Sequence, residues 1–139
     1  MTVAVGDRIP PFEVAEVSAE KMKTIAALLG DPNPIHWDLD AVAALGMGDR
    51  PINQGPLNMG YVINMLAAWA GGRDRVRRFR VRFRGNVLGG DHLIASGVVI
   101  DVRTEDGVRL AECEVSLDVV DGAQVLSGTA TVQLPEEAS

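Results

Sequence analysis

The 139-residue sequence has little of several features that mark particular classes of protein. Cys113 is the only cysteine, which excludes an internal disulfide framework and a zinc site built from several thiolates. No apolar run has the length that a membrane-spanning helix needs, because the longest, residues 59–70, is interrupted by Gly60, Tyr61 and Asn64. The first residues contain neither a basic leader nor a cleavage site after an apolar region, which favours a cytoplasmic location.

Basic residues are fewer than acidic ones, and the net charge of −6 argues against a general nucleic-acid binder. Even so, seven of the eleven arginines fall between Arg73 and Arg84. Within this stretch arginines alternate with apolar residues, so a strand here would have one cationic and one apolar face. A solvated outer face is the ordinary interpretation. The alternative is a binding site for phosphates, which suit the planar guanidinium group.

The first part of the chain contains signals for an edge strand and two helices. Residues 3–17 include two adjacent prolines, which favours an extended arm or a short edge strand. Ser18 and Gly30 are typical of the two caps of a helix, and apolar residues recur between them at helical spacing. Asp40 is the expected cap of a second, short helix that runs through Leu45.

A long apolar helix and a sheet are predicted for the rest of the chain. Gly55-Pro56 opens the helix, and its run to residue 70 is apolar on nearly every side, so we expect it to be buried all round. The segments that follow are predicted strands, at about 76–87, 91–104, 108–121 and 123–134. Tight turns separate them, which favours an antiparallel sheet wrapped around the helix. A chain of this size is expected to form a single domain, residues 1–139.

The stretch Asp31-Pro32-Asn33-Pro34-Ile35-His36 places an acid, a base and stiff backbone together. Pro32 and Pro34 fix φ and bias the residues before them away from helix, so this segment is a loop of nearly fixed shape. A kinked loop can direct Asp31 and His36 at one water molecule, where a carboxylate and an imidazole form an acid/base pair. Alternatively, Asp31 is a cap and His36 is a structural histidine.

The segment Gly30–His36, followed by Asp38, closely resembles the hydratase motif of MaoC-like proteins, the (R)-specific enoyl-CoA hydratases. The resemblance continues through Arg50-Pro51-Ile52, the helix after Gly55, the Gly90-Asp91 turn and the closing strands. It implies an α+β hot-dog fold, in which a curled antiparallel sheet surrounds a long central helix, in agreement with the predicted elements. It also implies acyl thioesters of coenzyme A or of acyl carrier protein as substrates, and chemistry that uses no metal and no cofactor.

Carried over to this chain, the resemblance makes Asp31 and His36 the catalytic residues. The thioester oxygen would be held at the start of the central helix, where Gly55 offers a free backbone amide and lets the substrate approach closely. Leu57 is expected to offer a second free amide. Polar residues on an apolar helix need partners or face a pocket, so Asn58 and Tyr61 are further candidates for substrate binding.

Other positions complete the predicted site. Asn33 is expected to bond its own backbone, and its alternative role is contact with substrate. Many MaoC-like hydratases have serine where this chain has Gly60, and Val-His where it has Asn53-Gln54. The glycine leaves space for a larger or branched acyl group. Arg82 and Arg84 are the expected partners of the coenzyme A phosphates.

The predicted activity is (R)-specific hydration of 2-enoyl thioesters, or the reverse dehydration of 3-hydroxyacyl thioesters. Two alternatives stay open: a non-catalytic or partner-dependent hot-dog subunit that binds acyl thioesters, and an acyl-CoA thioesterase on the same fold. An open sheet edge is usually covered, so a homodimer with a continuous sheet, or a heteromer with a related chain, is expected. Neither nucleic acid nor a membrane is an expected partner.

Overall fold

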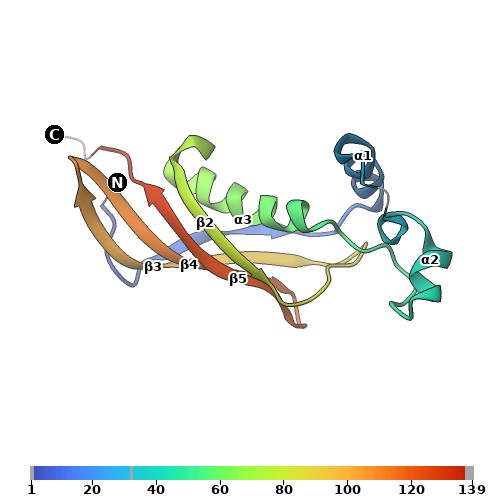
Figure 1. The fold of residues 1–139 in the computed structure, drawn as a ribbon. Coiled ribbons are helices and arrows are strands. Elements are labelled where there is room, and N and C mark those ends of the chain that lie inside the picture. Colours follow the sequence, from blue (N-terminus) through green and yellow to red (C-terminus); the bar gives the residue numbers. More distant parts are fainter. Residues whose placement is uncertain (1, 32, 137–139) are drawn as a thin grey trace.

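The structure is a computed structural model, which describes residues 2–31 and 33–136. A five-stranded antiparallel sheet in the order β1-β3-β4-β5-β2 curls along one side of a long helix, α3 (Figure 1). The strands are β1 (Arg8–Val14), β2 (Val76–Phe83), β3 (Leu93–Glu105), β4 (Val108–Val119) and β5 (Gln124–Gln133). The helices are α1 (Ala19–Leu29), α2 (Leu39–Ala44) and α3 (Gly55–Ala70), with short 3-10 turns η1 (Pro34–His36) and η2 (Arg73–Arg75). The predicted α+β hot-dog architecture is confirmed.

Helix α1 has the two ends that its sequence predicts. The Oγ atom of Ser18 accepts a hydrogen bond from the backbone amide of Lys21 at 3.2 Å. Gly30 closes the helix in the left-handed region, at φ 62°, a conformation that glycine adopts without steric cost. The next amide, of Asp31, turns back to the carbonyl of Ala26 at 3.0 Å. The end of α1 therefore fixes the backbone position of Asp31.

The cap of helix α2 is Asp38, and the prediction of Asp40 was wrong. The Oδ1 atom of Asp38 accepts from the amides of Asp40 at 3.0 Å and of Ala41 at 3.3 Å. Both aspartates precede the same short apolar run, but Asp40 already lies in the first helical turn, where its side chain cannot serve as the cap. The helix begins two residues earlier than predicted in consequence.

Strand β1 is an edge strand, as its prolines predicted. It pairs with β3 alone, and the register shifts between Ile9 and Phe12, where Pro10 and Pro11 interrupt the ladder. The hydrophobic core lies between the sheet and α3. It includes residues that point inward from three neighbouring strands and from the helix, among them Val99, Cys113, Ala130, Val62 and Leu66. No helix among the described residues is long and apolar enough to cross a membrane.

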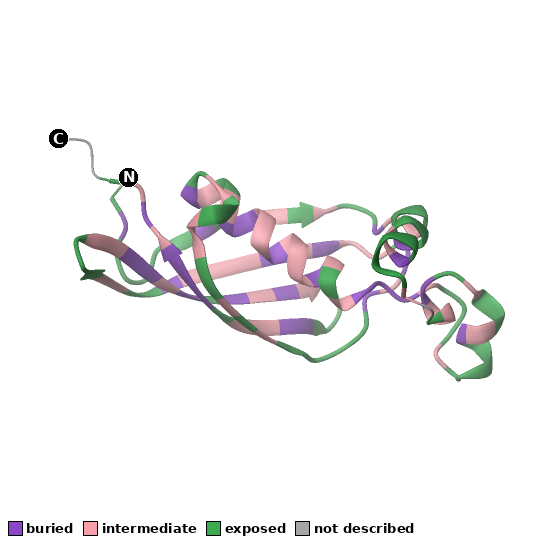
Figure 2. Cartoon of the chain, turned by 45° about the horizontal axis from the view of Figure 1, so that its top comes forward, coloured by how far each residue is buried: buried purple, intermediate pink, exposed green. Residues whose placement is uncertain are grey.

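Helix α3 is buried on one side only in the single chain, so the prediction that it is buried all round was wrong. Its buried residues are Asn58, Val62, Met65, Leu66 and Ala70. The remaining positions are partly or fully exposed, and Figure 2 shows this alternation along the helix. The sheet covers one side of the helix, and within the described chain nothing comparable covers the other. An apolar helix surface is left at the boundary of the molecule.

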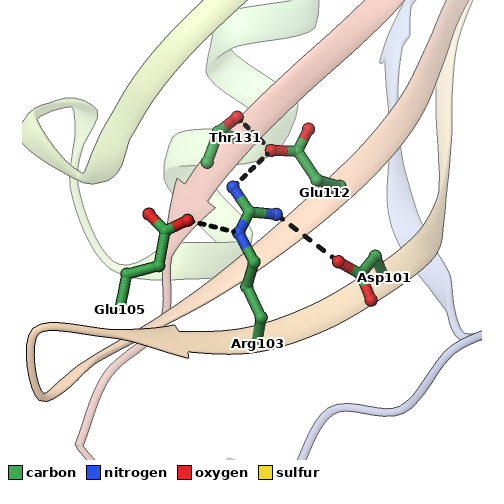
Figure 3. Close-up of polar contacts among 5 residues, drawn as sticks. All are labelled: Asp101, Arg103, Glu105, Glu112 and Thr131. Atoms are coloured by element: carbon green, nitrogen blue, oxygen red, sulfur yellow. Dashed lines mark hydrogen bonds and ion pairs between the residues drawn. The ribbon is translucent and has the colours of Figure 1, made fainter.

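The opposite face of the sheet carries a cluster of charged residues, which we term the Arg103 cluster (Figure 3). The Arg103 guanidinium lies 3.5 Å from the carboxylate of Asp101, 3.0 Å from that of Glu105 and 2.9 Å from that of Glu112. Thr131 donates a further hydrogen bond to Glu112 at 2.5 Å. Hydrogen bonds to Glu112 and then to Glu105 raise the pKa of Arg103 above its ordinary value. The cluster joins β3, β4 and β5 on their outer side.

Candidate active site

Asp31 and His36 meet just after the end of α1. The Nε2 atom of His36 lies 3.1 Å from Oδ2 of Asp31. The imidazole side chain is only 9% exposed, whereas the Asp31 side chain is 30% exposed. Solvent and small molecules therefore reach this pair from the side of the carboxylate.

Local hydrogen bonds in the loop orient the carboxylate. The Oδ1 atom of Asp31 accepts from the amide of Asn33 at 3.0 Å. Asn33 in turn accepts from the amide of Ile35 at 3.2 Å and caps η1, the local backbone role that asparagine favours. One carboxylate oxygen thus binds the loop, and the other is left for His36. The predicted contribution of Pro32 lies outside the described residues, and Pro34 begins η1.

The other ring nitrogen of His36 determines where its proton lies. Nδ1 is 2.5 Å from the carbonyl oxygen of Ile52, which can only accept, so Nδ1 carries a hydrogen. A neutral imidazole then has its lone pair on Nε2, facing Asp31. Nε2 is the ring nitrogen that meets Oδ2 of Asp31, at 3.1 Å. The two residues are suited to receive and deliver a proton as a unit.

The carbonyl of Ile52 is itself held by a short two-stranded contact between residues 50–53 and 87–91. The amide of Ile52 donates to the carbonyl of Ile35 at 2.9 Å, and Ile52 forms a β-bridge with Leu88. At the other end of this contact, Arg50 donates to Asp91 at 3.1 Å. The Arg50-Pro51-Ile52 segment and the Gly90-Asp91 turn thus fix the orientation of the imidazole through its Nδ1 atom, while Nε2 faces Asp31.

The start of α3 differs in part from the prediction. The amide of Leu57 donates to the carbonyl of Gln54 at 3.1 Å, so the expectation of a free amide at Leu57 was wrong. Gly55, at the first helical position, has no acceptor one turn before it. The ring of Phe83 packs closely against this glycine. A Cβ atom on Gly55 would lie only 3.1 Å from Phe83 Cζ. Phe83 is 50% exposed and forms one wall beside the helix start.

Asn58 and Tyr61 are linked through Asn53. The Nδ2 atom of Asn53 donates to Oδ1 of Asn58 at 2.7 Å and to the Tyr61 hydroxyl at 3.3 Å. Burial raises the pKa of Tyr61, and the hydrogen bond from Asn53 opposes this only in part. The hydroxyl stays protonated at neutral pH, and because its oxygen accepts from Asn53, its hydrogen is available to another acceptor. Buried Oδ1 of Asn53 has no partner among the described residues.

Gln54 has a role that sequence reasoning missed. Its side chain is almost fully buried, and Nε2 donates to the carbonyl of Met22 in α1 at 2.8 Å. This bond ties α1, which ends just before Asp31, to the helix that begins at Gly55. The sequence marked Gln54 only as a departure from the family pattern, and nothing local indicates a partner so far away in the chain.

The other predicted site residues lie apart from the pair. A Cβ atom on Gly60 would meet no atom within 4 Å, so this position faces open space. Phe83 contacts the start of α3, and the pleat turns its neighbours Arg82 and Arg84 to the opposite face of the sheet. There, Nε of Arg84 donates to Ser127 Oγ at 2.6 Å. Within a single chain, Arg82 and Arg84 lie apart from Asp31. Phosphate binding by these arginines stays a prediction.

An open depression of about 530 Å³ lies beside Asp31. It is lined by Lys23, Ala26 and Ala27 of α1 and by Trp37, whose surface is 47% exposed. The carboxylate of Asp31 is accessible from this depression. In the described parts of the chain, no three His, Cys, Asp or Glu side chains are close enough together to hold a metal ion.

Comparison with known families identifies the chain. The family described as "MaoC like domain" matches residues 4–121. The chain belongs to this family. A curated relative, a UPF0336 protein of Streptomyces avermitilis, is 44% identical over 45 residues, which are 32% of this chain and 30% of that protein. The match therefore spans less than a third of the relative.

Solved structures similar to this MaoC-like chain share its fold. The (R)-hydratase from A. caviae involved in PHA biosynthesis has a TM-score of 0.84 and 25% identity, over 96% of this chain and 98% of that one. (R)-hydratase PhaJ1 from Pseudomonas aeruginosa gives 0.82 and 23%, over 97% and 84%. The ChsH1-ChsH2 complex from Mycobacterium tuberculosis gives 0.79 and 20%, over 96% and 100%. The likeness to these solved structures shows the shared fold.

Proposed function

We propose that this chain is an (R)-specific hydratase of 2-enoyl thioesters, which also catalyses the reverse dehydration of 3-hydroxyacyl thioesters. The observation that carries the proposal is the Asp31–His36 pair, 3.1 Å apart, with Nδ1 bound to a carbonyl and an opening on the carboxylate side. Such a pair can position one water molecule and exchange protons with it. Family membership supports the same reaction class.

In the hydration direction, the water oxygen bonds to the β carbon of the enoyl group while its O–H bond breaks. The pair takes this proton and delivers a proton to the α carbon. Between these events negative charge develops on the thioester oxygen, and the free amide of Gly55 at the positive end of α3 would stabilise it. Because one pair handles both the water and the proton, the hydroxyl group and the hydrogen would add to the same face of the double bond.

The buried bond from Nδ1 to Ile52 restricts His36 to a single working nitrogen. Only Nε2 can exchange a proton, so the ring need not rotate during turnover. Asn58 and Tyr61 would line the acyl side of the pocket, with the Tyr61 hydroxyl as a donor to a substrate oxygen. The open position at Gly60 would admit a larger or branched acyl group.

The direct test follows the loss of enoyl-thioester absorbance with a panel of 2-enoyl-CoA esters, from crotonyl to bulky. Wild-type protein should hydrate at least one of them, and Asp31→Asn and His36→Ala should each lower kcat/KM by about a hundredfold or more. Asp40→Asn is the matched control, because Asp40 is an exposed aspartate in the first turn of α2. Turnover that survives Asp31→Asn would contradict the proposal.

A thioesterase is distinguished by the free thiol that it releases. Cys113, the only cysteine, is fully buried, and burial raises the pKa of its thiol to about 12. A thiol reagent added to native protein with acyl-CoA would therefore report released coenzyme A and not the enzyme. Release of thiol in proportion to enzyme would favour the thioesterase.

A partner-dependent subunit is the second candidate, and one observation favours it. The exposed side of α3 and the open edge of β2 leave apolar surface beside the helix start in the single chain. A second copy or a related hot-dog chain would cover this surface, and the solved ChsH1-ChsH2 complex shares the fold. Ester binding without turnover by the purified chain, with turnover restored by a partner, would establish this alternative.

A further inference from the structure

The carboxylate of Asp91 joins two segments that are far apart in the chain. Its side chain is only 10% exposed, and each of its two oxygens accepts from a different segment. Oδ2 accepts from the backbone amide of Leu88 at 2.9 Å. Oδ1 accepts at 3.1 Å from Nη1 of Arg50, which also donates to the carbonyl of Gly89 at 3.2 Å. One carboxylate therefore holds both sides of the contact that contains Ile52.

His36 is the first part of the candidate site that depends on this junction. Leu88, whose amide is bound by Asp91, forms the β-bridge with Ile52. The carbonyl oxygen of Ile52 lies 2.5 Å from Nδ1 of His36 and orients the ring. A change at Asp91 would therefore reach the imidazole through one β-bridge and one hydrogen bond.

The start of α3 is joined to the same junction. The backbone carbonyl of Val87 accepts from the amide of Asn53 at 2.7 Å, directly beside the β-bridge. Asn53 lies two residues before Gly55, the proposed donor to the thioester oxygen. The position of this donor therefore also depends on the contact that Asp91 holds together.

The beginning of α1 is bound to the backbone of Asp91 itself. The amide of Val17 donates to the carbonyl of Asp91 at 2.9 Å, and the amide of Gly90 donates to the carbonyl of Val17 at 2.9 Å. Val17 directly precedes the cap of α1, and this helix ends just before Asp31. The hydrogen bonds of one turn thus reach the elements that carry both members of the acid/base pair and the start of α3.

We propose that Asp91 is a positioning residue for the hydratase reaction, an inference that rests on the proposed function. By binding both sides of the β-bridge, its carboxylate sets where the carbonyl of Ile52 lies and so directs Nε2 of His36 toward Asp31. Both oxygens of Asp91 are already bound within the chain, so its effect passes through the groups that it holds. Small displacements of reacting groups slow the chemical step, so the loss should appear in kcat more than in KM.

The kinetic test replaces each partner of the ion pair with little change in size. Asp91→Asn cannot accept on both sides, so kcat for the best 2-enoyl-CoA ester should fall about tenfold, with KM changed by less than about twofold. Arg50→Met should cause a similar loss. Arg50→Lys should restore most of the rate, because a single nitrogen of Arg50 makes both contacts. Asp101→Asn, in the Arg103 cluster, is the matched control and should keep full kcat.

A second measurement follows the ring of His36 without any turnover. The sequence contains two histidines, so an NMR spectrum of isotope-labelled histidine contains two rings, and His36→Ala assigns them. In wild type, Nδ1 of His36 should keep its proton at every pH while Nε2 titrates. In Asp91→Asn, the ring should show a mixture of the two neutral tautomers, whereas Asp101→Asn should leave its signals unchanged.

Two outcomes would overturn the proposal. One is unchanged kcat per folded molecule in Asp91→Asn together with an unchanged His36 tautomer, even if its unfolding midpoint is lower, because Asp91 would then have a structural role only. The other is an equal loss of kcat in Arg50→Lys and Arg50→Met. If Asp91→Asn does not fold, as judged by circular dichroism, the two Arg50 variants provide both readouts. Absence of turnover in wild type would instead contradict the proposed hydratase, and the NMR measurement would still test Asp91.

Discussion

Two groups of charged side chains in this molecule differ in how completely their charges are paired and in how far they face solvent. In the Arg103 cluster, three carboxylates surround one guanidinium, and Thr131 donates to one of them, so each charge meets an opposite charge (Figure 3). In the Asp31–His36 pair, a buried imidazole meets one carboxylate and one backbone carbonyl, and the carboxylate faces an open depression. The first arrangement links neighbouring strands. The second leaves a carboxylate and an imidazole in contact beside an opening to solvent.

The largest effect should come from breaking the pair itself. Asp31→Asn and His36→Ala should each reduce kcat/KM by about a hundredfold or more, and the double variant should lose little more than the worse single variant, because both residues act on one water. The measurement is a double-mutant cycle on the best enoyl-CoA substrate. Losses that multiply would indicate that the two residues act independently.

The next largest effect should come from breaking the hydrogen bond between Gln54 and Met22, which links α1 to the start of α3. Gln54→Leu removes the buried hydrogen bond to the Met22 carbonyl inside α1, which should lower the free energy of unfolding by about 0.5–1.5 kcal/mol. Denaturant unfolding measures the loss, and Gln124→Leu, at an exposed glutamine, is the control. An unchanged midpoint would mean that Gln54 does not link the two helices in solution.

A smaller effect is expected at the open position on α3. Gly60→Ser should reduce kcat/KM for bulky enoyl esters by about tenfold relative to crotonyl-CoA, because it fills space that a branched acyl group would occupy. Serine also suits a helix interior better than glycine, so Tm should not fall. Ala68→Ser, at an exposed site on the same helix, controls for the added hydroxyl. Equal losses for all esters would place Gly60 outside the acyl pocket.

The smallest effect should come from the Arg103 cluster. Arg103→Gln should leave kcat/KM unchanged and lower Tm by no more than a few °C, since partly exposed ion pairs contribute little and salt screens them. Thermal unfolding at low and high salt measures this, with Arg8→Gln as the control at an arginine that has no ion pair among the described residues. A clear loss of activity would mean that this cluster is coupled to the site.

Much of the fold could be predicted because its signals are local. Ser18 and Gly30 cap α1 by contacts within a few residues, and the prolines of β1 mark an edge. The Asp31–His36 pairing also follows from a short, stiff loop. Asp38 and Asp40 fit the same cap pattern two residues apart, so local rules could not separate them. The contact of Gln54 with Met22, and the uncovered side of α3, depend on how distant elements pack, which composition and periodicity do not reveal.

The reactivity of the single cysteine can report how often the sheet opens spontaneously. Cys113 lies in the middle of β4, paired with Val99 on one side and with Ala130 on the other, and it points into the core. Alkylation requires an exposed thiolate, and with a pKa of about 12 the native thiol offers almost none. Labelling in plain buffer would therefore proceed only through molecules whose sheet has come apart. The rate of labelling would therefore measure how often the sheet opens, without denaturant, dye or added tag.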